Sequence, residues 1–79
     1  MNNNNLDLQN IADYRRTTGL NQSKFWQLFG YTQSGGSRFE AGREIPDSVS
    51  LLLIFHSQGI LTDEDLKQAA SDLASHRAQ

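Results

Sequence analysis

The sequence predicts an all-α protein. Apolar residues recur at helical spacing in several segments, no window alternates between apolar and polar residues with the period of a strand, and capping residues and glycines separate the segments. The chain has 79 residues, about half of a typical ~150-residue domain, so we expect at most one domain. Helix-bundle cores can close at this size, but only just.

The chain begins with an asparagine tract, residues 1–5, which has no periodicity and is expected to be a disordered tail. The remainder, residues 6–79, is expected to form a single domain. In its first helix, residues 6–18, apolar side chains recur at helical spacing until Gly19 supplies a C-terminal cap.

Two short helices follow, separated by a turn that contains Gly30. Asn21 is a favourable N-cap for the first of them, residues 22–29, whose apolar side chains end at that glycine. Thr32 caps the second, residues 33–41, which carries small polar side chains on one face.

The fourth expected helix, residues 46–58, has proline at its first position, a favourable place for it. The apolar run 49–55 covers nearly all of its surface and predicts that this helix is buried. For the fifth helix, Thr62 and Asp65 resemble a capping box, and the helix runs to about His76 with a thin apolar stripe.

Composition favours a soluble, cytoplasmic protein. The hydrophobic share of 37% and the charged share of 20% are ordinary for a globular chain, and no apolar run approaches the ~18 residues of a membrane span. There is no cysteine for a disulfide or a thiolate zinc site, and the N-terminus lacks the layout of a signal peptide. No membrane partner is therefore expected.

Charge is unevenly distributed along the chain. Residues 1–43 carry five Lys or Arg against three Asp or Glu, whereas residues 44–79 carry two against six. The N-terminal half can therefore meet phosphate, while the C-terminal half would be repelled by it. The surplus is small, so the charge suggests an orientation on a polyanion rather than proving that one binds.

The sequence does not indicate an enzyme. No Ser, His and acid are arranged as a nucleophile system, and no glycine-rich phosphate loop follows a strand. His56 and His76 are 20 positions apart with no cysteine near either, which favours surface or hydrogen-bonded histidines over a metal site. We expect no metal, no cofactor and no small-molecule ligand.

The two short central helices with their glycine-containing turn meet the requirements of a helix-turn-helix DNA reader. A closer likeness is carried by Leu20-Asn21-Gln22-Ser23, Phe25, Gly30, Thr32-Gln33-Ser34, Ser37-Arg38-Phe39-Glu40, Gly42 and Pro46. In order and spacing, these residues resemble the lambda-repressor-like family of Cro and repressor proteins over about residues 8–56. The resemblance implies a compact five-helix domain whose second and third helices form the helix-turn-helix. It also implies a homodimer that places each recognition helix, 33–41, in the major groove of an operator.

The recognition helix carries the candidate base readers. Glutamine can pair with adenine, and arginine with guanine, through two hydrogen bonds each. The candidates are Gln33, Ser34, Ser37 and Arg38. The alternative is that these residues are only the solvated face of an amphipathic helix.

Phosphate contacts are expected around the base readers, because about half or more of protein–DNA hydrogen bonds go to the backbone. Gln22 matches the family position that holds a phosphate, and Arg43 lies where the family has a basic loop; Lys24 is a further candidate. Each of the two cations is alternatively a surface charge that only tunes the general field. Arg15 and Glu40 match family positions that form a structural ion pair, and the alternative for Arg15 is a contact with DNA.

The sequence departs from the family at two linked positions. Trp26 stands where the second helix normally has a small residue, and Gly36 stands where the recognition helix normally has Ile or Val. These positions face each other in the family fold, and close-packed cores tolerate exchanges that conserve volume. We therefore expect the indole to lie on Gly36.

Dimerisation is expected through the C-terminal half, because the basic helices must stay free for DNA. The candidate interface residues are Ile60, Leu61, Leu66, Ala70 and Leu73. The alternative is that the fifth helix simply closes the core of the monomer. The leading function is a Cro-like transcriptional regulator, most simply a repressor. The alternatives are the DNA-binding antitoxin of a toxin–antitoxin pair and a protein-interaction module on the same scaffold.

Overall fold

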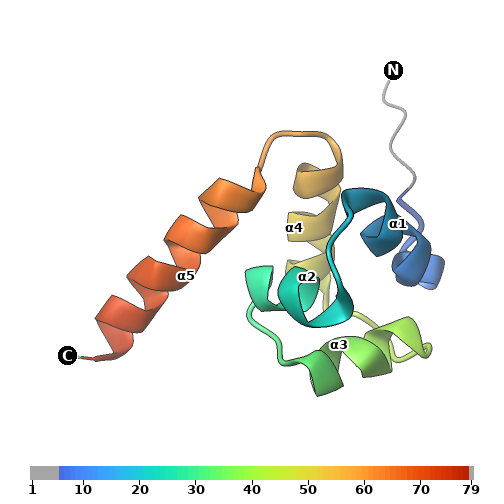
Figure 1. Cartoon of the computed structure of the whole chain (residues 1–79), viewed down its shortest axis with the longest axis horizontal. Helices are drawn as coiled ribbons and strands as arrows, with labels where there is room; N and C mark the ends of the chain where they lie inside the picture. Colours follow the sequence, from blue (N-terminus) through green and yellow to red (C-terminus); the bar gives the residue numbers. More distant parts are fainter. Residues whose placement is uncertain (1–5, 79) are drawn as a thin grey trace.

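The computed structural model describes residues 6–78, so the expected tail lies outside the described part. Within it the chain is all-α, as predicted, and these residues contain no strand (Figure 1). Its elements are a 3-10 turn at Leu8–Asn10 followed by α1 Ile11–Thr18, α2 Gln22–Leu28, α3 Gln33–Glu40, α4 Asp47–Ser57 and α5 Asp63–Arg77. None of these helices is long and apolar enough to cross a membrane.

The first helix begins later than predicted. Asp7 caps a single 3-10 turn, its carboxylate accepting a hydrogen bond of 2.9 Å from the backbone N–H of Gln9. Asn10 then leaves the helical region with φ −140°, and α1 starts at Ile11. Short polar side chains compete for backbone hydrogen bonds in this way, which apolar spacing alone does not reveal.

The core is rich in aromatic side chains and draws on all five helices. Trp26 and Phe25 of α2 are completely buried, with Ile11 of α1 and Leu53 of α4. The rings of Trp26 and Phe39 have centroids 5.2 Å apart, so α2 and α3 meet through them. This packing fixes how the second and third helices lie relative to each other.

Helix α4 is not buried all round, contrary to the prediction. Val49 and Leu53 face the core, but Leu51 is 57% exposed and Phe55 is 43% exposed. An apolar run longer than one turn covers every face of a helix, whereas the body of this protein packs on only one of them. The burial predicted for α4 was therefore too high, and the outer side of this helix is an exposed apolar surface.

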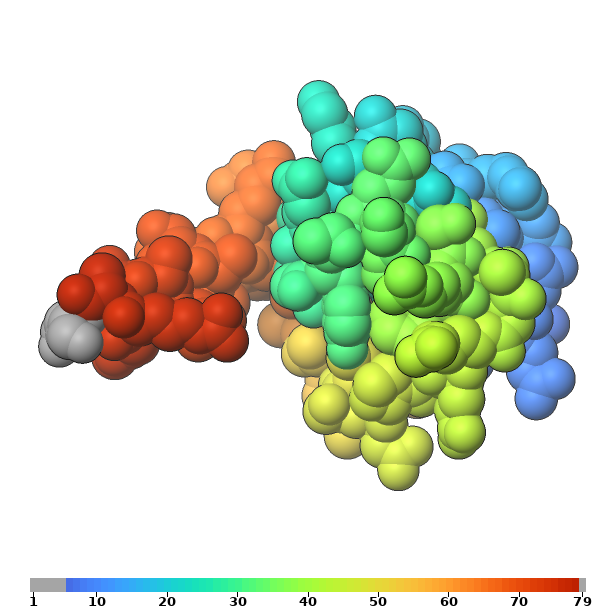
Figure 2. All heavy atoms as spheres, turned by 90° about the horizontal axis from the view of Figure 1, so that it is seen from below, coloured from blue at the N-terminus to red at the C-terminus, as the bar shows by residue number. Residues whose placement is uncertain are grey.

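Helix α5 is attached to the body only at its start. The capping box predicted at Thr62 and Asp65 is present. Leu66 is 5% exposed and lies in the core, but every described residue from Lys67 onward is exposed. Figures 1 and 2 show the helix leaving the body as an arm.

The start of α5 is also tied to α1 and α4 through His56. Its Nδ1 lies 2.7 Å from the hydroxyl of Tyr14, and its Nε2 lies 2.7 Å from a carboxylate oxygen of Asp63. With Nε2 protonated, the hydroxyl donates to Nδ1 and Nε2–H donates to Asp63. Burial and then the charge of Asp63 raise the pKa of Tyr14 above its ordinary 10.0, so its hydroxyl stays a donor. His56 is therefore the hydrogen-bonded histidine that the sequence allowed.

Candidate nucleic-acid interface

Helices α2 and α3 pack against each other as a helix-turn-helix. The turn between them passes through Gly30, whose φ of +87° favours a residue without a side chain. The Thr32 hydroxyl then accepts a hydrogen bond of 3.1 Å from the backbone N–H of Gly35, which starts α3 as predicted. The turn and the cap together direct one face of α3 away from the core.

That outward face contains a shallow, open hollow. It is lined by five of the residues predicted to contact DNA, namely Gln22, Gln33, Ser34, Ser37 and Arg38. In Figure 2 the molecule is seen from the side of α3, and this helix lies at the surface nearest the viewer. We call this surface the α3 hollow. The structure thus brings the four candidate base readers together with one candidate phosphate contact.

The side chains of the α3 hollow differ in how they are held. Within the described part of the chain, those of Ser34, Ser37 and Arg38 are exposed and make no hydrogen bond to protein. Gln33 is different, because its amide nitrogen donates to the amide oxygen of Gln22 at 3.4 Å. Three of the candidate readers are therefore free to meet a ligand, and the fourth is already oriented.

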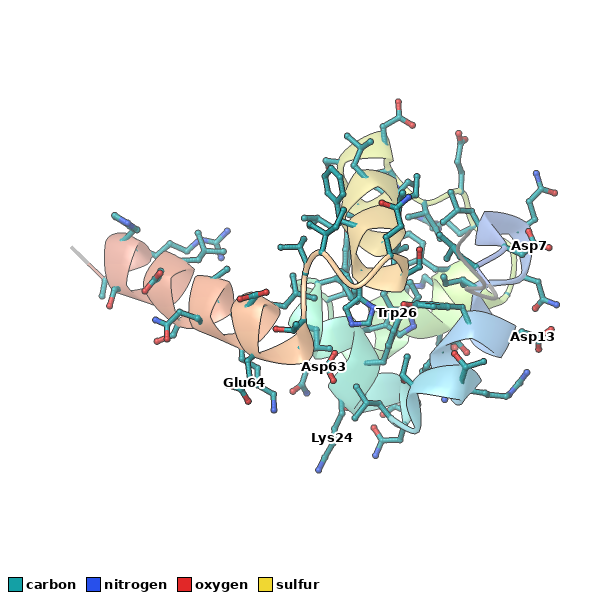
Figure 3. All side chains as sticks on the ribbon, turned by 90° about the horizontal axis from the view of Figure 1, so that it is seen from above. Asp7, Asp13, Lys24, Trp26, Asp63 and Glu64 are labelled. Carbon is teal, nitrogen blue, oxygen red and sulfur yellow. The ribbon has the colours of Figure 1, made fainter. Side chains whose placement is uncertain are left out.

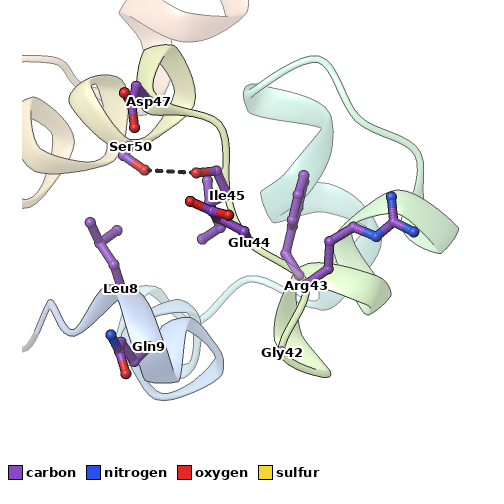
Figure 4. Close-up of a pocket in the computed structure, with 9 residues that line it drawn as sticks. Leu8, Gln9, Gly42, Arg43, Glu44, Ile45, Asp47 and Ser50 are labelled. Atoms are coloured by element: carbon purple, nitrogen blue, oxygen red, sulfur yellow. Dashed lines mark hydrogen bonds between the residues drawn. The ribbon is translucent and has the colours of Figure 1, made fainter.

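The other two candidate phosphate contacts lie outside the hollow. Lys24 lines a separate groove between α2 and α5 together with Leu28 and Ala70, and its exposed side chain extends from the body (Figure 3). Arg43 follows α3 and lines a third groove, where its guanidinium points away from Leu8 (Figure 4). Neither cation lines the α3 hollow, although both are exposed and the backbone N–H of Arg43 donates to the carbonyl of Arg38 at 3.0 Å.

Arg15 and Glu40 form the expected ion pair behind the hollow. Arg15 Nε lies 2.8 Å from one carboxylate oxygen of Glu40 and Nη2 lies 3.2 Å from the other. Burial alone would raise the pKa of Glu40, but hydrogen bonds from Arg15, Trp26 and Gln22, with the charge of Arg15, outweigh burial and lower that pKa. The carboxylate is therefore kept charged beneath the recognition helix.

Trp26 lies on Gly36, as the volume argument predicted. A Cβ atom added to Gly36 would overlap the indole ring and come within 2.8 Å of Trp26 Cβ. The hydrogen bond from indole Nε1 to Glu40 at 2.8 Å was not anticipated. Its signal was in the sequence, since a buried tryptophan needs an acceptor and Glu40 lies one turn of α3 beyond Gly36.

The predicted dimerisation residues fall into three groups. Ile60 and Leu73 are 59% and 47% exposed, and Ala70 is also exposed. Leu61 is half-buried and packs against the core. Leu66 does not belong with them, because it is buried within the monomer, where it fixes α5 to the body. Sequence reasoning missed the exposed side chains of α4, since it assigned that helix to the interior.

Comparison with known protein families agrees with this geometry. Residues 12–56 match the RsaL-like HTH domain, which is more than half of the chain and contains both helices of the helix-turn-helix. No curated protein and no solved structure matches the chain. The match supports a DNA-binding regulator and does not single out the Cro and repressor proteins. The chain belongs to the RsaL-like helix-turn-helix domain family.

Proposed function

We propose that this protein is a sequence-specific transcriptional regulator of the Cro or repressor type, which inserts α3 into the major groove of an operator. The observation that carries this proposal is the α3 hollow, where short donors and acceptors gather on the exposed face of the second helix of a helix-turn-helix. The role requires no catalytic group.

The side chains divide by chemistry into readers and anchors. Gln33 suits adenine and Arg38 suits guanine, while Ser34 and Ser37 can bond to either kind of edge. Gln22 has one amide hydrogen left for a phosphate after it donates to Glu40 at 3.1 Å. Arg43 and Lys24 lie outside the hollow. Their charges attract the phosphate backbone of DNA and carry no sequence information.

The operator complex is proposed to be a homodimer. One recognition helix reads about one half-site, and two must lie roughly 34 Å apart to occupy successive major grooves on one face of DNA. Leu73 and Ala70 on the arm, Ile60 in the corner before it, and Leu51 and Phe55 on α4 are exposed apolar side chains that a partner copy would cover. Buried Leu66 is left out of this revised surface.

Selection of bound duplexes from a random pool tests the proposal. Enrichment of a defined site by the wild type, in the form of an inverted repeat, is the expected result. Enrichment of a single half-site would support base reading by α3 but would contradict the homodimer. A pool that stays random at low and moderate salt would contradict sequence-specific regulation and favour the interaction module. Co-purification of the chain with a second protein encoded beside it would instead favour the antitoxin.

A further inference from the structure

Glu40 of α3 accepts hydrogen bonds from side chains of two other helices. Arg15 of α1 donates to both of its oxygens, Trp26 of α2 donates to Oε2 at 2.8 Å, and Gln22 of α2 donates to Oε1 at 3.1 Å. We call these four side chains the Glu40 network. Among the described residues no buried side-chain N or O atom lacks a hydrogen-bond partner, so the network is closed on its inner side.

Its outer side continues to the DNA-facing surface. The negative charge of Glu40 requires that Gln22 present its amide nitrogen inward, which turns the amide oxygen of Gln22 outward. That oxygen accepts from the amide nitrogen of Gln33 at 3.4 Å. The direction of the Gln33 amide is therefore fixed by a buried charge through one intermediate residue.

This direction matters for base reading. To recognise adenine, a glutamine must accept from N6 with its oxygen and donate to N7 with its nitrogen, and an amide rotated by 180° presents the wrong pattern. With one amide hydrogen of Gln33 directed to Gln22, its oxygen and its second hydrogen remain for the base.

Trp26 is the part of this arrangement that depends on the unusual glycine. Because Gly36 has no side chain, the indole lies directly on α3 and its N–H reaches Glu40 one turn further along. Arg15 donates to both oxygens of the carboxylate and Trp26 adds a second donor at Oε2, so the carboxylate is held from α1 and α2 together. The pair of Trp26 and Gly36 thus does more than conserve volume.

We propose that Trp26 is a positioning residue for base recognition, acting through Glu40 and Gln22 to orient the amide of Gln33. The proposal rests on the proposed function. It assigns a role in specificity to a side chain that is completely buried and touches no DNA.

The chain contains a single tryptophan, so a tryptophan analogue incorporated biosynthetically replaces Trp26 alone. β-(Benzothienyl)alanine keeps the ring shape and lacks the N–H group, whereas 5-fluorotryptophan keeps the N–H group and is the matched control. Helicity and the denaturant midpoint are measured for both, and Trp26→Phe is the second variant if the benzothienyl protein does not fold.

The readout is discrimination at two single base pairs of the selected duplex. One is the pair at which Gln33→Ala loses discrimination, and the other is the pair identified in the same way with Arg38→Ala. We expect the benzothienyl protein to lose about tenfold discrimination at the Gln33 pair, which corresponds to about 1.4 kcal/mol, while keeping it at the Arg38 pair. The fluorinated protein should match the wild type at both pairs.

Two outcomes of this comparison would overturn the proposal. Unchanged discrimination at the Gln33 pair would show that the indole N–H orients nothing, and equal losses at both pairs would show a general loosening of α3. A wild type without any site preference would instead refute the proposed function, so the two failures are distinguishable.

A titration of the Glu40 carboxyl carbon by NMR gives an independent check. Because the indole donor helps to lower the pKa of Glu40, the benzothienyl protein should titrate at higher pH than the fluorinated one. Coincident titrations would show that Trp26 does not act on Glu40 and would also overturn the proposal.

Discussion

At the scale of single residues, the stability of the helix-turn-helix depends on a charged carboxylate held beneath α3. This carboxylate belongs to Glu40, whose side chain is 8% exposed. The side chain of its partner Arg15 is 14% exposed, so both charges are largely removed from water. Such a pair is costly to break, because the remaining partner is left buried without compensation. Glu40 therefore links packing in the core to the acid sensitivity of the fold.

Glu40→Gln should lower the free energy of unfolding at pH 7 by roughly 2–3 kcal/mol, somewhat less than for a fully buried pair because Arg15 keeps some contact with water. The pKa of Glu40 is lowered in the folded state from its ordinary 4.5, so its stabilisation is complete above that value and is lost as pH falls through and below it. Denaturant unfolding should show that the free energies of unfolding of wild type and variant approach each other as pH falls from 7 to 3.

The matched control for this change is Asp13→Asn. It removes an exposed ion pair with Arg16, one turn away on α1, which should cost less than about 0.5 kcal/mol at any pH. A constant difference between Glu40→Gln and wild type across the pH range would contradict the charge-based account.

A second prediction at this scale uses two neighbouring glycines of α3. Replacement by alanine should favour a helix by roughly 1 kcal/mol at either position. At Gly35 the new Cβ would lie 3.3 Å from the ring of Tyr31, which must give way slightly, and 3.6 Å from the hydroxyl of Thr32, whereas at Gly36 it would overlap the indole of Trp26. Thermal melts should therefore find Gly35→Ala neutral or stabilising.

Gly36→Ala should be destabilising by about 1–3 kcal/mol, and Gly36→Ile more so, because the core would be overpacked. Adding Trp26→Ala to Gly36→Ile should recover part of the loss, but not the hydrogen bond to Glu40. If the two single alanine variants melt alike, the close packing of Trp26 on Gly36 is wrong.

At the scale of elements, α5 depends on its first turn. Three features hold this first turn: the capping box, buried Leu66 and the hydrogen bond from His56 to Asp63. The described residues beyond Leu66 are exposed. An isolated helix of this length is marginal in water, so most of the arm draws little stability from the monomer.

Amide hydrogen exchange of dilute protein should therefore show protection of residues 70–77 at least about tenfold below that of α4. His56→Ala should lower the protection of residues 70–77 further. It should also destabilise the body by about 1–3 kcal/mol, because the buried Tyr14 hydroxyl loses its partner. Equal protection of α4 and the arm in the monomer would contradict the free arm.

These elements also show what the sequence could and could not predict. Caps such as Thr32 and the capping box at Thr62 are local, so the starts of α3 and α5 followed from short-range chemistry. The burial of Leu66 and the exposure of Phe55 depend on which side of each helix the body occupies, which no local pattern contains. In the α3 hollow, the residues were predictable from position, whereas the bond between Gln22 and Gln33 required the fold.

At the scale of the whole molecule, the basic and acidic halves of the sequence have separate tasks in this account. The α3 hollow belongs to the half with excess cations, and the arm belongs to the half with excess anions. The anions of α5 gather in its first turn, at Asp63, Glu64 and Asp65, so repulsion from phosphate acts on the start of the helix and keeps this side of the molecule available for a second copy.

Leu73→Asp tests this division. The side chain is exposed in the monomer, so helicity and melting temperature should be little changed, whereas the sedimentation mass should fall toward the monomer and affinity for a two-half-site duplex should fall with it. Ser71→Asp adds the same charge to another face of α5 and should leave the mass unchanged. A Leu73→Asp protein that still sediments as a dimer would show that the arm is not part of the interface.

The central claim is that the α3 hollow reads bases while cations outside it hold phosphates. The most direct measurement compares Gln33→Ala, Arg38→Ala and Arg43→Ala on the selected duplex and on a random duplex over a range of salt. We expect the first two to lose about 1–3 kcal/mol on the selected duplex only, and Arg43→Ala to weaken both duplexes and reduce the salt slope by about one. Equal losses on both duplexes for Gln33→Ala and Arg38→Ala would contradict base reading by this surface.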